Sequence, residues 1–279
     1  MPILAAIWSL ILPAVLALWP GVGRGDPGRG DGPVSNHTCV MSVGEDLTYE
    51  VSWSVFKLGQ IRVKTLRSKT DGGELRYVVQ AFIDSYRGVP FVDLHAISTT
   101  EMDTGFYSRG YRSLEKKNGE WWGLNYLYNL PNRTLIVEQT WQKDLRSQPY
   151  RESVFDTLRI QKEWFEDALS LLYFARGRAR TEQELQVPTM VYGKIGATAF
   201  RFTNRQTVEK ISALEKPVRV VKFDGKAKFS GMFGLTGDFS GWFSDDEAAV
   251  PIKAKMKVIL GNITIELKQW NRERWRPPL

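Results

Sequence analysis

The chain has 279 residues and a formal net charge of +7, with 38 Lys or Arg against 31 Asp or Glu. The charge favours anionic partners, but the basic residues are spread out and no nucleic-acid-binding module accompanies them, so nucleic acid is excluded as the predicted partner. The single cysteine, Cys39, excludes an intramolecular disulfide, and we read it as an unpaired thiol near a flexible end.

The first residues resemble a secretory signal. The stretch Ile3–Trp19 is apolar apart from Ser9, which is the length of a signal core and short for a membrane span of roughly 20 residues. Small residues at Gly21–Gly23 predict cleavage before Arg24. The usual positive charge before Ile3 is missing, and an uncleaved membrane anchor is the alternative. We expect an exported protein of the periplasm or outer cell envelope.

A linker follows the leader. Arg24–Pro33 (RGDPGRGDGP) is made almost wholly of Gly, Pro, Asp and Arg and cannot bury enough apolar surface to fold. The predicted organisation is a signal peptide over 1–23, a flexible linker over 24–42, one β-rich domain over 43–270 and a C-terminal tail over 271–279.

The domain opens with strand patterns. Apolar and polar residues alternate from Leu47 to Val55, and Ile61–Thr65 continues as a partner after a break at Gly59. A turn at Asp71–Gly73 leads to a third strand over Tyr77–Ile83. Further predicted strands cover residues 92–102, 106–114, 121–128, 134–141 and 153–160. This spacing is typical of an antiparallel meander and not of a parallel α/β sheet.

One segment has helical spacing. Its apolar residues are Ala168, Leu169, Leu171, Leu172, Ala175 and Ala179. Asp167 is the predicted N-cap, Gly177 an early stop, and Arg176, Arg178 and Arg180 complement the C-terminal dipole. The acidic residues Glu163, Glu166 and Asp167 suit the positive helix start without a catalytic role. We expect the apolar face to be buried against the concave face of a sheet.

Strands resume over residues 187–192, 199–204, 208–212 and 218–229, and the end of the chain predicts a hairpin. From Ile252 to Leu260 apolar residues alternate with lysines, Gly261-Asn262 reads as the turn, and Ile263–Leu267 alternates again. The predicted core face carries Ile252, Ala254, Met256, Val258 and Leu260. The fold class is therefore mostly β, with a single large curved antiparallel sheet or half-open barrel and one helix in or near its concave face. A closed barrel with an external helix is the alternative.

Catalytic constellations are scarce. A triad of His95 with Asp93 and either Ser98 or Ser108 has no spacing that positions a nucleophile. Other sequence fingerprints of enzymes or cofactor sites are missing, so we predict no enzyme, no catalytic residue and no cofactor. The acidic cluster Ser244–Glu247 could ligate a hard cation, but a strand-end turn whose carboxylates cap backbone N–H groups fits better, and no metal is predicted.

The aromatic content is more suggestive, with ten tryptophans in the chain. The strand phase predicts that an apolar hollow is faced by Tyr49, Trp53, Trp242, Met256 and Val258, although each can equally be a packed core residue. The glycine-flanked loop Gly231–Gly237 presents Met232, Phe233 and Leu235, which we interpret as the lip of that hollow.

Four segments together resemble the bacterial family called domain of unknown function 3108. They are GEDLTYEVSWSVFKLGQIRV (Gly44–Val63), DALSLLYFAR (Asp167–Arg176), VPTMVYGK (Val187–Lys194) and GDFSGWFSDDEAAVPIKAKMKVILGNITIEL (Gly237–Leu267). The resemblance spans about Val43 to Trp270. It implies an exported envelope protein with an open half-barrel fold similar to periplasmic lipoprotein carriers, which hold acyl chains. It supplies no catalytic residues.

Two hypotheses follow. The first is non-covalent binding of a lipid, lipidated or otherwise amphipathic ligand in the hollow of the sheet, with a membrane surface as a further contact. The second is a structural or protein-interaction component of the bacterial envelope, whose concave face is filled by its own helix. An enzyme acting on envelope glycans or lipids is third. A cavity that remains beside the helix separates the first two, and convergent polar groups with perturbed pKa values would favour the third.

Overall fold

The computed structural model describes residues 37–89, 93–117, 119–129, 132–142, 152–160, 164–191, 193–227, 237–258 and 261–279. They contain two short helices, α2 (His37–Val40) and α3 (Ser170–Arg176). The first eight strands are β1 (Asp46–Trp53), β2 (Phe56–Asp71), β3 (Glu74–Ser85), β4 (His95–Asp103), β5 (Ser108–Lys117), β6 (Glu120–Asn129), β7 (Thr134–Gln142) and β8 (Glu152–Arg159). The other six are β9 (Glu182–Val191), β10 (Lys194–Glu209), β11 (Val218–Ala227), β12 (Gly237–Ser244), β13 (Pro251–Val258) and β14 (Gly261–Asn271).

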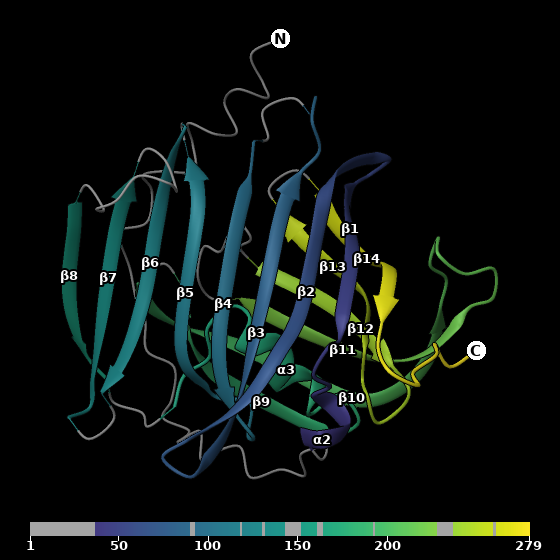
Figure 1. The fold of residues 1–279 in the computed structure, drawn as a ribbon. Helices are drawn as coiled ribbons and strands as arrows, with labels where there is room; N and C mark the ends of the chain where they lie inside the picture. The colour runs from purple at the N-terminus through teal and green to yellow at the C-terminus, as the bar shows by residue number, and fades with distance from the viewer. Residues whose placement is uncertain are drawn as a thin grey trace, which may run out of the picture.

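All fourteen strands form one sheet, in the order β8-β7-β6-β5-β4-β3-β2-β1-β14-β13-β12-β11-β10-β9. The chain runs outward from β1 to the edge strand β8, crosses to the opposite edge at β9, and returns strand by strand until β14 pairs with β1 (Figure 1). Because β8 and β9 remain edges, the sheet is not closed into a barrel. The predicted curved, half-open antiparallel sheet is confirmed, and the closed barrel is wrong.

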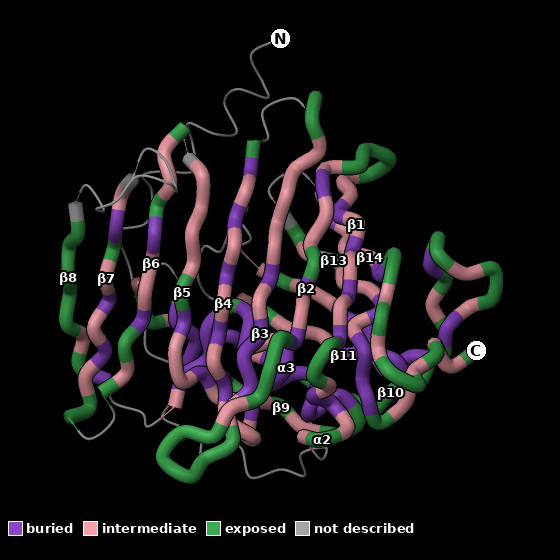
Figure 2. The backbone as a smooth tube through the Cα atoms, in the orientation of Figure 1, coloured by how far each residue is buried: buried purple, intermediate pink, exposed green. Residues whose placement is uncertain are grey.

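The crossover between the two edges carries α3, which lies between the two halves of the sheet (Figure 1). Buried residues gather around this helix, whereas the side chains described on β8 are mostly exposed (Figure 2). A second, smaller core forms where β9 approaches β6 and β7, with Met190 packed beside Tyr126 and Val137. The sheet is therefore rolled far enough for its two halves to share a core with α3.

The C-terminal hairpin has the predicted pairing. Ala254 is opposite Ile265 and Met256 is opposite Ile263. Lys255 is exposed, as the alternation requires, because a register slip by one residue would bury it. The predicted turn is wrong: Gly261 already pairs with Val258 inside β14, so the connection is residues 259–260, which lie outside the described residues.

Two other boundaries differ from the sequence prediction. Gly59 does not break a strand but pairs with Val51 inside β2, and the turn falls at Ser54-Val55. The strand predicted over 199–204 and the start of the one predicted over 208–212 belong to one continuous strand, β10, which ends at Glu209, so residues 210–212 are not strand. A register shift between Phe202 and Arg205 absorbs the irregular residues, so the strand continues past them.

The folded part extends beyond the predicted domain at both ends. Val40 and Met41 are buried against the main core, so residues assigned to the linker belong to the fold. At the C-terminus, the indole of Trp275 donates to Asp246 Oδ2 at 2.9 Å. The backbone N–H of Arg219 donates to the carbonyl of Pro278 at 2.7 Å. The predicted tail is therefore attached to the domain.

Helix α3 is short because both ends are fixed by specific contacts. Asp167 Oδ1 accepts the N–H groups of Leu169 and Ser170, both at 2.8 Å, and Ser170 Oγ accepts the N–H of Asp167 at 2.9 Å. This reciprocal arrangement resembles a capping box. The regular helix begins only at Ser170, after Leu169, whose side chain makes no capping bond, so Asp167 caps the turn that leads into α3. At the other end, a Cβ on Gly177 would lie 2.3 Å from the ring of Phe106, so only glycine fits there.

A buried arginine ties this helix to the rest of the protein. Arg176 has no exposed side-chain surface, and its Nη1 donates to Glu45 Oε1 at 2.7 Å. Its Nη2 also donates to the carbonyls of Val40 and Ala248, and its Nε to the carbonyl of Ala249, at 3.1–3.2 Å. The prediction that Arg176 merely complements the helix dipole therefore missed its main role, which is to join α3 to the Val40–Glu45 segment and to the loop at Ala248-Ala249.

Arg272, at the end of the last strand, completes the ion pair. It donates to Glu45 Oε2 and to the carbonyls of Val40 and Cys39. One carboxylate therefore compensates two guanidinium groups, and backbone oxygens take the remaining donors. A buried charge group is tolerated only when it is satisfied in this way.

The acidic cluster after β12 shapes the loop that supplies those carbonyls. Asp246 Oδ1 accepts the N–H groups of Ala248 and Ala249 at 3.0 and 3.1 Å, and also the hydroxyl of Ser244 at 2.9 Å. Ala249 adopts a positive φ of 45°. The turn interpretation of this cluster is confirmed: its carboxylate fixes the loop conformation that aims the carbonyls of Ala248 and Ala249 at Arg176.

We expect Glu45→Gln to lower the free energy of unfolding by about 3–5 kcal/mol, because it leaves two arginines without their shared negative charge. Glu50→Gln is the matched control, since Glu50 pairs with the exposed amines of Lys57 and Lys268. That change should cost less than about 1 kcal/mol. Reversible urea denaturation measures both, and equal costs would contradict the assigned role of Glu45.

The same carboxylate predicts a pH dependence. Burial alone would raise the pKa of Glu45, but Arg176 and Arg272 hold this pKa below its ordinary value of 4.5. A carboxyl with a lower pKa in the folded state contributes its full stability above the unfolded pKa and loses it as the pH falls through the folded pKa. The difference in unfolding free energy between wild type and Glu45→Gln should therefore shrink below pH 4.5. A difference that grows on acidification would be inconsistent with this assignment.

Candidate ligand-binding cavity

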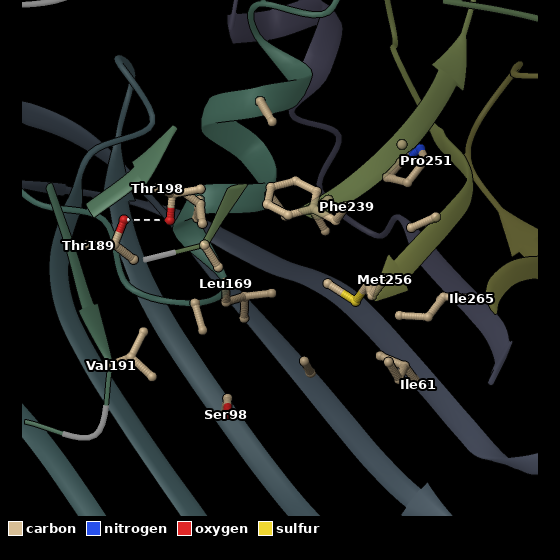
Figure 3. A pocket seen from close by; sticks show the side chains of 18 of the residues that line it. Ile61, Ser98, Leu169, Thr189, Val191, Thr198, Phe239, Pro251, Met256 and Ile265 are labelled. Atoms are coloured by element: carbon tan, nitrogen blue, oxygen red, sulfur yellow. Dashed lines mark hydrogen bonds between the residues drawn. The ribbon is translucent and has the colours of Figure 1, made fainter. Parts of the chain in front are cut away.

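A cavity of about 370 Å³ remains between α3 and the concave face of the sheet. Strands from both halves of the sheet contribute to its wall, which is mainly aliphatic and aromatic. In Figure 3, Phe239, Met256 and Ile265 come from the C-terminal strands, while Leu169 and Val191 lie across the cavity from them. The helix therefore occupies only part of the hollow.

The apolar face of the helix borders this cavity. Ala168, Leu169, Leu171, Leu172 and Ala175 all line it. The prediction that all five are buried against the sheet is wrong in part: Ala168 is exposed, and Leu171 and Leu172 are only half-buried, because open space lies beside them. The opposite side of the helix carries the fully buried Tyr173 and Phe174, which attach α3 to the protein.

Aromatic rings form the wall at β10–β12. The rings of Phe200 and Phe239 meet edge to face with centroids 5.7 Å apart, and Phe223 lies 5.9 Å from Phe200. A Cβ on Gly225 would lie 2.2 Å from the ring of Phe239. The glycine thus lets this ring lie across β11. The wall is consequently packed and smooth, and suits an apolar ligand.

Most polar groups in the wall satisfy one another. Ser98 and Tyr111 share a hydrogen bond of 3.2 Å, and Thr189 donates to Thr198 at 3.0 Å (Figure 3). The hydroxyl of Tyr49 is buried and has no hydrogen-bond partner among the described residues. Burial raises the pKa of this hydroxyl well above its ordinary value, so it is a neutral donor. Its oxygen has no accessible surface, so the wall offers a bound molecule few free polar groups.

Charged residues also border the cavity, namely Glu115, Asp238, Lys253 and Lys257. The ammonium group of Lys253 lies 3.4 Å from carboxylate oxygens of both Glu209 and Glu266. Charge is thus present at the border of the cavity, whereas the wall itself is mainly apolar.

Three of the five residues predicted to face the hollow line the cavity: Tyr49, Trp242 and Met256. The ring of Trp242 also lies about 6 Å from the amines of Lys222 and Lys255. Trp53 does not line the cavity, because β1 ends there and its ring stacks on Phe56 with centroids 6.3 Å apart. Val258 ends β13, and its side chain lies outside what the structure describes.

The predicted lip residues Met232, Phe233 and Leu235 lie outside the described residues, so the lip stays a prediction. Sequence reasoning missed the wall residues of the other half of the sheet, including Ala81, Ser98, Tyr111 and Tyr126, and also Met190 on the edge strand β9. Their alternation marks an inner face, but no local signal shows which part of that face the helix leaves uncovered.

A buried acidic pair lies next to the cavity. Asp167 Oδ2 accepts the hydroxyls of Thr100 and Ser108 at 2.5 and 2.6 Å. Both carboxylate oxygens of Glu166 are buried with no hydrogen-bond partner among the described side and main chains. Burial raises the pKa of both groups, which for Glu166 favours the neutral acid. The pair holds the crossover in place, since the backbone of Glu166 bonds to Pro188 and Met190 of β9.

The residues considered for a triad do not converge. His95 bonds through Nδ1 to Asp84 at 2.8 Å, and its Nε2 lies 3.3 Å from Asp93. Ser98 is three positions along the same strand and so points to the opposite face, toward Tyr111. Ser108 instead bonds to Asp167. Neither serine is activated by this histidine.

The protein is a half-barrel β protein: an open antiparallel sheet curves around one helix and an apolar cavity. The chain belongs to the family described as Protein of unknown function (DUF3108), which matches residues 48–268. The resemblance seen in the sequence is thereby confirmed. No curated protein matches the chain.

One solved structure supports the fold. The chain is similar to a beta-barrel-like protein of domain of unknown function DUF1849 from Brucella abortus, with 11% identity and a TM-score of 0.53, covering 84% of this chain and 99% of that one. It also matches the hypothetical protein CT021 from Chlamydia trachomatis at 9% identity and a TM-score of 0.31, over 87% of this chain and 94% of that one. In the part of the chain that the structure describes, neither helix is long and apolar enough to cross a bilayer.

We expect Leu172→Ala to lower the free energy of unfolding by less than about 2 kcal/mol, because the half-buried side chain borders a cavity. Phe174→Ala on the same helix removes a fully buried ring and should cost about 3–5 kcal/mol. Urea denaturation compares the two. A larger loss for Leu172→Ala than for Phe174→Ala would show that the leucine is packed and the cavity closed.

Proposed function

We propose that this protein binds one lipid, lipidated or otherwise amphipathic molecule non-covalently, with an acyl chain in the cavity beside α3. The observation that carries the proposal is the cavity itself, which remains after the helix has packed into the hollow. Its volume of about 370 Å³ lies within the range of roughly 300–1,000 Å³ that is usual for small-molecule sites.

The chemistry of the wall favours a hydrocarbon chain. Leucines of α3 and aromatic rings of β10–β12 face each other across the space, and the paired hydroxyls of Ser98 and Thr189 offer little to a polar solute. Each methylene group moved from water into such a site contributes about 0.8 kcal/mol. A chain of several methylene groups therefore supplies enough affinity without any charge contact.

An amphipathic ligand also needs a place for its polar end. Lys257 borders the cavity and is exposed, whereas the Lys253 amine at the same border is already held by Glu209 and Glu266. A carboxylate or phosphate group at the end of an acyl chain matches the ammonium group of Lys257. This combination supports binding of an amphiphile over binding of a plain hydrocarbon.

The cavity also favours ligand binding over a purely structural role, since a structural protein would gain stability by filling the hollow with its own side chains. The contacts of His95, Ser98 and Ser108 support binding without catalysis. As part of the same proposal, the protein is exported to the cell envelope by the leader expected over Ile3–Trp19. Membrane lipids, lipoproteins and envelope protein partners are present in that compartment.

Filling the cavity tests the proposal. We expect Ala168→Trp to weaken binding of a fluorescent fatty acid at least tenfold, roughly the value of two lost methylene contacts, because Ala168 lines the cavity and its side chain faces open space. Val208→Trp is the matched control, since Val208 is 56% exposed on β10 and does not line the cavity.

The melting temperatures of both variants should be close to that of the wild type. Fatty-acid binding that is equal in wild type and Ala168→Trp would show that this cavity is not the site. A wild-type protein that binds neither fatty acids nor phospholipids would favour the envelope interaction protein instead.

A further inference from the structure

The turn between β1 and β2 exposes large apolar side chains to solvent. Val55 is 84% exposed and Phe56 62% exposed, at the turn that joins β1 to β2. Ser54, which precedes the apolar pair, adopts the positive φ of 54° that the tight turn requires. Large apolar side chains gathered in water mark a contact surface more often than an accident of sequence.

A row of apolar side chains leads from Phe56 to the cavity. Phe56 is opposite Trp53, Trp53 is opposite Ile263, Ile263 is opposite Met256, and Met256 is opposite Phe239. Residues directly opposite each other in a sheet lie on the same face, so these five side chains form one row across β2, β1, β14, β13 and β12. The row begins in solvent at Phe56 and ends at Met256 and Phe239, which line the cavity.

The surface beside the turn is basic. Lys57 follows the turn directly, and Lys255 and Lys257 are exposed on β13. The nearby acidic groups are Glu50, which lies 3.0 Å from the Lys57 amine, and Asp238, which lies 3.7 Å from the amine of Lys226. Cations therefore outnumber anions around the exposed apolar pair.

We propose that the Ser54–Lys57 turn docks on an anionic lipid bilayer, and that the row from Phe56 to Phe239 is the path by which an acyl chain passes between that bilayer and the cavity. Val55 and Phe56 enter the interface, while the three lysines meet the headgroups. The docking does not depend on the proposed function, whereas the transfer along the row rests on it.

A bilayer suits this surface better than a protein partner. Specific protein interfaces bury roughly 1,000 Å² or more over a broad, complementary patch, which a convex two-residue tip cannot supply. A membrane interface accepts one or two apolar side chains on a narrow tip, and each nearby lysine adds attraction to anionic headgroups.

Co-sedimentation with vesicles tests the docking. The full chain should bind vesicles of phosphatidylcholine with phosphatidylglycerol, and bind phosphatidylcholine alone much more weakly. V55S/F56S should reduce binding to the anionic vesicles at least roughly tenfold. V154S/F155S is the matched control, because Val154 and Phe155 are 54% and 62% exposed on the far edge strand β8, and it should bind like wild type.

A second variant keeps the proposal falsifiable if V55S/F56S does not fold. K255E/K257E should lose most of its binding to anionic vesicles. Added salt should weaken wild-type binding. The docking would be overturned if the wild-type protein bound neither type of vesicle, or if V55S/F56S and V154S/F155S lost binding to the same extent. A protein partner would then be the better explanation of the exposed turn.

The transfer is measured separately, with a fluorescent fatty acid supplied either in solution or from anionic vesicles. V55S/F56S should bind the dissolved probe like wild type but take it up from vesicles several-fold more slowly. An equal rate from vesicles would overturn the path. Failure of wild type to bind the dissolved probe would count against the cavity proposal and leave the vesicle-docking result unaffected.

Discussion

The fold depends on one buried contact, the bonding of Arg176 to Glu45 and to backbone carbonyls. A guanidinium group without exposed surface is tolerated only if every donor is met. Here the Glu45 carboxylate and the backbone carbonyls of Val40, Ala248 and Ala249 accept its donors. Glu45, Arg176 and Ala248 belong to three of the segments that carry the family resemblance. The most recognisable parts of the sequence are therefore those that build this contact.

That contact determines where the cavity lies. The last turn of α3 is held by Arg176 and its start by Asp167, so the helix cannot slide deeper into the hollow. Tyr173 and Phe174 fasten one side of it, and Leu171 and Leu172 are left facing the sheet across open space. A rigid frame with one unfilled apolar side is what a reversible binding site requires, because the empty state must keep its shape.

Much of this could be predicted from the sequence, because strand alternation and helix capping are local. The phase of β1 and β13 correctly placed Tyr49 and Met256 on the inner face, and Asp167 correctly marked the turn that leads into the helix. The ion pair could not be predicted, since Arg176 and Glu45 are 131 positions apart and nothing local links them. Trp53 shows the same limit for the site. The alternation along β1 places Trp53 on the correct face of the sheet. Only the tertiary arrangement shows that the cavity reaches Met256 in this row of side chains and does not extend to Trp53.

The central claim is that an acyl chain occupies the space between α3 and the sheet. A crystal structure of the protein with a fatty acid brominated near the end of its chain tests this most directly, because the anomalous signal of bromine locates the chain without interpretation of weak density. We expect the bromine between Leu171 and Met256, with α3 in its present position. Bromine only on the outer surface, or a cavity closed by Leu172, would contradict the claim.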